Sequence, residues 1–156
     1  MNYFKFECSN FNDGKEIKAT TTRIKMIEQT ELIVSKWIYQ PPVNSIEGAG
    51  QKLTSHISFD VMKKRTSTKK GIACRFTCEY VFEKETILEY VAEHSYVIDH
   101  ADIIDKIELQ KMIKNTYAMF NEKFDLRKLS TVLINQTLTP IDETMYELDP
   151  ILLLLR

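Results

Sequence analysis

The spacing of hydrophobic residues changes once along this chain, and it changes late. From residue 17 to about residue 98 apolar and polar residues alternate, whereas from about residue 102 to 135 the apolar residues recur every third or fourth position. The first pattern indicates strands and the second indicates helices. Strands followed by helices are typical of an antiparallel sheet with helices on one side. The sequence therefore predicts an α+β fold, in which a four- to five-stranded antiparallel sheet is followed by two helices packed on one face.

Strand-like alternation occupies most of the first hundred residues. It is found in residues 2–8, 17–34, 53–63, 72–83 and 87–98. The second stretch changes phase near Met26, which predicts a bulge or a bend. Pro41 and Pro42 cannot donate to a strand ladder, so residues 37–50 are predicted to form a connector.

The last predicted strand carries apolar residues on both faces. Leu88 and Tyr90 lie on one face, and Ile87, Val91 and Val97 lie on the other. The helices can cover only one face of the sheet, and another chain could cover the second. This shortage of cover predicts a partner chain.

Helix signals begin at Asp102, a residue type that often caps the N-terminus of a helix. An apolar stripe follows to about Lys123, and Asp125 is predicted to cap a second, shorter helix. The apolar face predicted for this second helix consists of Leu126, Leu129, Val132 and Leu133. Pro140 interrupts the helical pattern, and residues 149–156 are predicted to form a short apolar tail.

Composition and charge narrow the class of protein. A chain of 156 residues fits one domain over residues 1–156, and its net charge of -1 gives no reason to expect nucleic acid as a partner. The basic residues between Lys63 and Lys70 include no aromatic residue, so they are interpreted as a solvated turn. The first ten residues lack the apolar core of a signal peptide, and three cysteines suit a reducing compartment. We therefore expect a cytoplasmic protein without stable membrane insertion.

The reactive side chains do not form a recognisable catalytic or metal-binding pattern. Cys74 and Cys78 share one face of a predicted strand and have no second pair of ligands, which favours buried thiols over zinc. His56, His94 and His100 belong to no triad or nucleophile-elbow signature. We therefore expect no enzyme activity, no cofactor and no metal.

Aromatic residues are the remaining signal. Trp37 and Tyr39 precede the proline pair, where large side chains are harder to explain as sheet core. They are interpreted as lining a groove for extended apolar polypeptide, together with Phe82. Packing of these side chains within a loop is the alternative explanation.

Three short segments resemble the SecB-type protein-export chaperones. Residues 6–10 (Phe-Glu-Cys-Ser-Asn) are similar to that family's early Phe-Glu-x-Pro-Asn segment, with Ser9 in place of the usual proline. Residues 78–82 (Cys-Glu-Tyr-Val-Phe) resemble a Cys-Glu-Val segment of a central strand. Residues 138–142 (Leu-Thr-Pro-Ile-Asp) resemble the Pro-Val/Ile-Asn/Asp segment between the two helices.

The resemblance implies a four-stranded antiparallel sheet with two helices, assembled as a dimer of dimers. We therefore expect a homo-oligomer, either a dimer or a tetramer. It also implies an ATP-independent holdase that keeps unfolded or partly folded polypeptide in apolar grooves, with protein export as one role. The chain is nearly neutral where export members are acidic, and it ends in an apolar tail. A dedicated client, such as a toxin–antitoxin component, is therefore equally compatible.

Two other functions fit the same sequence. One is a non-catalytic, self-associating interaction module of a mobile element or phage, in which the apolar sheet face serves only assembly. The other is an α+β domain with a small-ligand or catalytic pocket between sheet and helix.

Overall fold

Six strands and two α-helices form the described part of the chain, which covers residues 2–9, 26–29, 31–47, 53–65, 70–98, 105–142 and 144–155 of a computed structural model. The strands are β1 (Asn2–Ser9), β2 (Met26–Gln29), β3 (Ile33–Tyr39), β4 (Leu53–Arg65), β5 (Lys70–Phe82) and β6 (Glu85–Ile98). The helices are α1 (Lys106–Arg127), a 3₁₀ turn (Lys128–Ser130) and α2 (Leu148–Leu155). Several predicted features lie outside the described residues, namely residues 17–25, the basic segment 66–69, His100 and Asp102.

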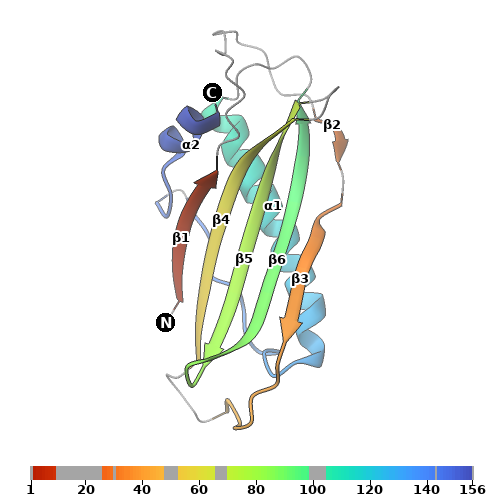
Figure 1. The fold of residues 1–156 in the computed structure, drawn as a ribbon, viewed down its shortest axis with the longest axis vertical. Coiled ribbons are helices and arrows are strands. Elements are labelled where there is room, and N and C mark those ends of the chain that lie inside the picture. Colours follow the sequence, from red (N-terminus) through yellow and green to blue (C-terminus); the bar gives the residue numbers. More distant parts are fainter. Residues whose placement is uncertain are drawn as a thin grey trace.

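The strands form one mainly antiparallel sheet (Figure 1). β4, β5 and β6 are consecutive antiparallel neighbours, and β3 and β2 both pair antiparallel with β6. This arrangement confirms the predicted α+β class and its antiparallel sheet. β1 differs, because it pairs parallel with β4. Between these two strands the chain crosses to the opposite edge of the sheet and forms β2 and β3 there, so β1 and β4 are not joined as a hairpin.

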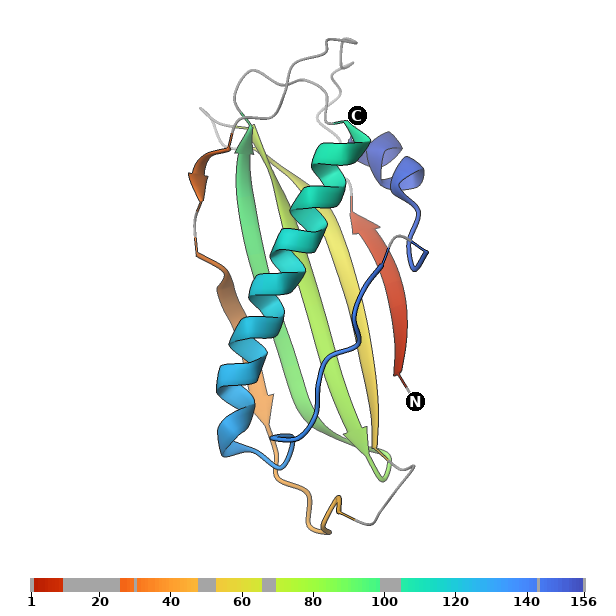
Figure 2. The same ribbon diagram turned by 180° about the vertical axis from the view of Figure 1, so that it is seen from behind.

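One face of the sheet carries the hydrophobic core. α1 crosses this face diagonally, and the connector that follows it runs back beside α1 to α2 (Figure 2). Aromatic rings join the layers, since Tyr90 stacks on Phe120 with ring centroids 4.1 Å apart, and Phe76 lies 5.6 Å from Phe120. The alternate residues of β4, β5 and β6 that face α1 are buried, as the period of two requires.

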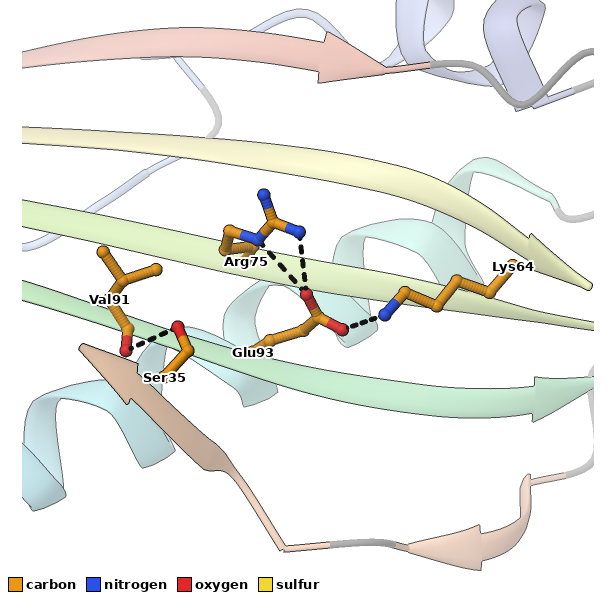
Figure 3. A network of polar contacts seen from close by, with 5 residues as sticks. All are labelled: Ser35, Lys64, Arg75, Val91 and Glu93. Atoms are coloured by element: carbon orange, nitrogen blue, oxygen red, sulfur yellow. Dashed lines mark hydrogen bonds and ion pairs between the residues drawn. The ribbon is translucent and has the colours of Figure 1, made fainter.

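The opposite face of the sheet is mainly polar, but Val91 and Val97 lie on it as predicted, and only Ile87 departs from the expectation. Ile87 lies in a bulge where the pairing of β5 and β6 shifts register, and its side chain is buried. Glu93 stands near the middle of this face and accepts hydrogen bonds from Lys64 and Arg75 (Figure 3). Val91 lies among such polar side chains and is half-buried.

The helix boundaries also differ from the prediction. Asp105 is the N-cap of α1, and its carboxylate accepts from the backbone N–H of Glu108 at 2.7 Å. α1 continues through Asp125, which forms an ion pair with Lys128 at 2.9 Å instead of capping a new helix. The second helix is α2, where an apolar tail was expected. Its buried Leu148, Ile151 and Leu155 follow helical spacing, so burial of this stripe stabilises the helix.

Candidate functional site

Trp37 and Tyr39 belong to strand β3 and not to a connector, which corrects their predicted setting. Trp37 lies opposite Tyr90 and Tyr39 lies opposite Leu88, so both side chains are on the α1 side of the sheet. A bulge at Ser35 shifts the register of β3 and thereby turns these residues towards the core side. The connector begins only at the residue after Tyr39.

The indole of Trp37 is held between the sheet and the last turn of α1. Its ring centroid lies 5.2 Å from that of Tyr90 and 6.4 Å from that of Phe124. The guanidinium of Arg127 lies 5.5 Å from the centre of the indole, a cation–π contact of about 0.5–1 kcal/mol at a partly exposed site. Trp37 is therefore fixed in orientation while part of its surface stays accessible.

Tyr39 connects β3 to the turn after α1. Its hydroxyl accepts a hydrogen bond from the backbone N–H of Val132 at 3.0 Å, across 93 positions of sequence. Phe82, the third predicted binding residue, is only 2% exposed and lies at the end of β5, opposite Leu53 and Glu85. The structure therefore brings Trp37 and Tyr39 together and places Phe82 elsewhere, in the core. Whether the first two bind polypeptide stays a prediction.

Exposed apolar residues lie at the end of α1 and in the turn after it, the segment that Trp37 and Tyr39 contact through Arg127 and Val132. Leu126 is 67% exposed, and Leu129 and Val132 are exposed as well. Together with Trp37 and Tyr39 they form what we call the edge surface. These leucines had been assigned to the buried face of a second helix, but of the predicted set only Leu133 is buried.

A sequence signal for this exposure was available. The buried stripe of α1 includes Ile113, Tyr117, Phe120 and Phe124. If the helix is continued past Asp125, Leu126 and Leu129 fall outside that stripe at about 100° per residue. The error therefore came from placing a helix boundary at Asp125.

The outer edge of β3 borders this surface. Among the described residues β3 pairs only with β6, which leaves the hydrogen-bonding groups on its other side without a strand partner. Ile33 and Ile38 project from the same strand and are exposed, and they lie opposite Glu93 and Glu89 on the polar face. The edge therefore has accessible apolar side chains on both sides of the sheet.

Two buried cysteines, Cys74 and Cys78, lie in the hydrophobic core. Burial raises the pKa of the Cys74 thiol to about 12, so it is protonated near neutral pH, and burial raises the pKa of Cys78 as well. A protonated buried thiol is a poor nucleophile and a poor metal ligand. Within the described ranges no three His, Cys, Asp or Glu side chains are grouped so that they could hold a metal ion. None of the described helices has the length and apolarity needed to span a bilayer.

The fold and the edge surface together define a class: an α+β domain with one helix-covered sheet face, one polar face and an apolar strand edge. No family model matches the sequence, and no curated protein matches it. One similar solved structure is the Mycobacterium tuberculosis Rv1957 SecB-like chaperone in complex with a ChAD peptide from the Rv1956 HigA1 antitoxin. That comparison covers 73% of this chain and 90% of the other, at 13% identity and a TM-score of 0.47.

A second similar structure is a protein of unknown function from Streptococcus agalactiae. The likeness covers 74% of this chain and 95% of that chain, at 10% identity and a TM-score of 0.42.

Proposed function

We propose that this protein is a non-catalytic, ATP-independent holdase that binds unfolded or partly folded polypeptide at the edge surface. The observation that carries the proposal is the exposure of Leu126, Leu129 and Val132 in the chain segment that contacts the aromatic pair through Arg127 and Val132. Side chains exposed in this way are favourable contacts for an apolar partner, because burying their surface contributes roughly 25 cal/mol per Å².

The geometry suits a partner that has no fixed structure. The edge surface combines the two side chains that are held in place, Trp37 and Tyr39, with leucines on a helix end that can change rotamer. Rigid aromatic anchors next to adaptable aliphatic groups fit many apolar sequences without strict shape selection. The segments that resemble the SecB-type chaperones support the same function. A dedicated client, such as a toxin–antitoxin component, is the narrower form of the proposal.

The test is suppression of aggregation without nucleotide. An enzyme denatured in guanidinium is diluted into buffer with increasing amounts of this protein, and light scattering is followed. We expect scattering to fall as the protein approaches and exceeds the client concentration, and we expect no effect of added ATP. Undiminished scattering at a several-fold excess of the protein would rule out the holdase function.

A second candidate is the self-associating interaction module, which the exposed Ile33 and Ile38 on an open strand edge favour. Two substitutions on opposite faces of β3 separate the two functions. In the holdase, Trp37→Ala weakens client binding and leaves the mass in solution as in the wild type. In an assembly module, Ile38→Lys lowers the oligomeric mass, which sedimentation equilibrium measures.

A further inference from the structure

We infer that the client is held as an additional β-strand on the outer edge of β3, hydrogen-bonded to the main chain of Trp37 and Tyr39. This inference rests on the proposed function and specifies how that site binds. It predicts that the client's backbone contributes to binding, and that every second side chain of the client contacts the same face of this protein.

The direction of the main-chain groups follows from one hydrogen bond at the end of β3. The backbone N–H of Gln40 donates to the carbonyl of Ile87 in β6 at 2.9 Å, so the main-chain hydrogen-bonding groups of Gln40 face β6. In an antiparallel pair, hydrogen-bonded and non-hydrogen-bonded residues alternate. The backbone N–H and C=O of Ile38 therefore also point towards β6. The backbone N–H and C=O of Trp37 and Tyr39 point the other way, to the open edge of β3.

The same two residues present their side chains to the edge surface. Trp37 and Tyr39 lie on the α1 side of the sheet, and α1 ends over β3 (Figure 2). A strand added beside them would place every second side chain on that side, next to the edge surface. Its other side chains would lie on the polar face beside Lys36 and Ile38. The partner that fits is an extended segment in which apolar residues alternate with polar ones.

The part of the β3 edge that can pair with another strand is short, because features at both of its ends block pairing. Proteins commonly protect strand edges with bulges, lysines and prolines. Here a bulge at Ser35 breaks the register on one side, and Pro41 and Pro42 follow on the other. The uninterrupted register runs only from Lys36 to Tyr39. The sequence thus leaves open the part of the edge that holds the two aromatic residues.

This length favours a transient client over a second copy of the chain. A stable protein dimer buries about 800 Å² on each partner, which so short a strand edge does not supply by itself. A holdase needs only weak, reversible contacts that many segments of one client can repeat. The occupant we assign to this edge is therefore the client strand.

The experiment uses the fact that Trp37 is the only tryptophan in the chain. Trp37 emission is titrated with an acetylated ten-residue peptide in which leucine or valine alternates with threonine and lysine. Two versions with methylated backbone nitrogens are compared. One is methylated at two successive apolar residues, which are two positions apart in the peptide, and the other at two successive polar residues. Neither version changes a side chain, so only backbone hydrogen bonding differs.

We expect one methylated version to bind about three- to tenfold more weakly for each hydrogen bond lost, and the other to bind like the parent peptide. Loss from the apolar positions indicates an antiparallel client strand, and loss from the polar positions indicates a parallel one. Equal binding by all three peptides would overturn strand addition and leave the holdase intact. No emission change with any peptide would overturn both proposals.

A matched pair of variants separates the backbone from the side chain. Tyr39→Pro removes the outward N–H, which an edge strand tolerates, and Tyr39→Val removes the same aromatic ring but keeps the N–H. We expect Tyr39→Pro to bind the unmodified peptide at least threefold more weakly than Tyr39→Val. Equal affinities would contradict the inference. A wild-type dimer that Tyr39→Pro abolishes and Tyr39→Val retains would assign the edge to a second copy and refute it.

Discussion

Replacing Leu126 by lysine tests whether the end of α1 binds client. Complete burial of a leucine contributes about 1.5–3 kcal/mol, and Leu126 is still 67% exposed. A client that covers it would therefore gain about 1–2 kcal/mol from this one residue. We expect Leu126→Lys to weaken client binding by about 5- to 30-fold, since 1.4 kcal/mol corresponds to a factor of ten.

The fold should tolerate this change. Leucine and lysine have similar helix propensities, and substitutions at exposed positions usually alter stability by less than about 0.5 kcal/mol. Leu153 provides a matched control, because it lies on α2, is 69% exposed and is not part of the edge surface. Leu153→Lys makes the same chemical change on an equally exposed helical residue.

The assay is a titration of both variants with a fluorescently labelled, permanently unfolded polypeptide, followed by anisotropy. Urea denaturation of the free proteins checks that both fold as the wild type does. The account predicts a weakened Leu126→Lys and an unchanged Leu153→Lys. Equal affinities for the two variants would refute the assignment of binding to the edge surface, whatever their common value.

Three further predictions concern stability. Burial lowers the pKa of His94, whose ring nitrogens have no hydrogen-bond partner among the described residues. The unfolded chain therefore binds a proton that the folded chain does not, and the free energy of unfolding should fall as the pH drops below about 6.5. A wild-type profile of stability against pH that parallels the profile of His94→Phe would contradict this. Lys84 has a φ of 68°, so Lys84→Gly should stabilise the β5–β6 turn by about 0.5–1 kcal/mol in urea denaturation, and a loss of stability would disprove strain there. Tyr96→Phe removes a 2.7 Å hydrogen bond with Thr116 and should cost about 1–2 kcal/mol; an unchanged urea midpoint would show that the bond is not stabilising.

Local pattern predicted the centre of the sheet well, because most of β4, β5 and β6 alternates between buried and less buried residues, apart from the bulge at Ile87, and each strand pairs with its neighbour in sequence. It could not predict that β1 runs parallel to β4, since strand direction depends on where the intervening chain goes. The helix boundary at Asp125 was wrong because aspartate is common at N-caps, and here an ion pair with Lys128 accommodates it inside the helical run.

The candidate site was predicted in part. The proline pair drew attention to Trp37 and Tyr39, but the bulge that turns them towards α1 is a feature of strand pairing and is not visible in the sequence. Leu126 was predicted to lie on the buried face of a second helix, because it is apolar. Apolar character alone does not show whether a side chain faces the core or the solvent. Phe82 is aromatic like Trp37, but it alternates along β5 with the buried Cys78 and Tyr80 and is itself buried in the core.

The central claim is that unfolded polypeptide binds beside Trp37 without nucleotide. The most direct measurement is the emission of this single tryptophan during titration with a permanently unfolded, tryptophan-free polypeptide in nucleotide-free buffer. The account predicts a saturable change in emission intensity and wavelength, which Leu126→Lys shifts to higher polypeptide concentration. Polypeptide binding that is detected by anisotropy but leaves the emission of Trp37 unchanged would contradict it.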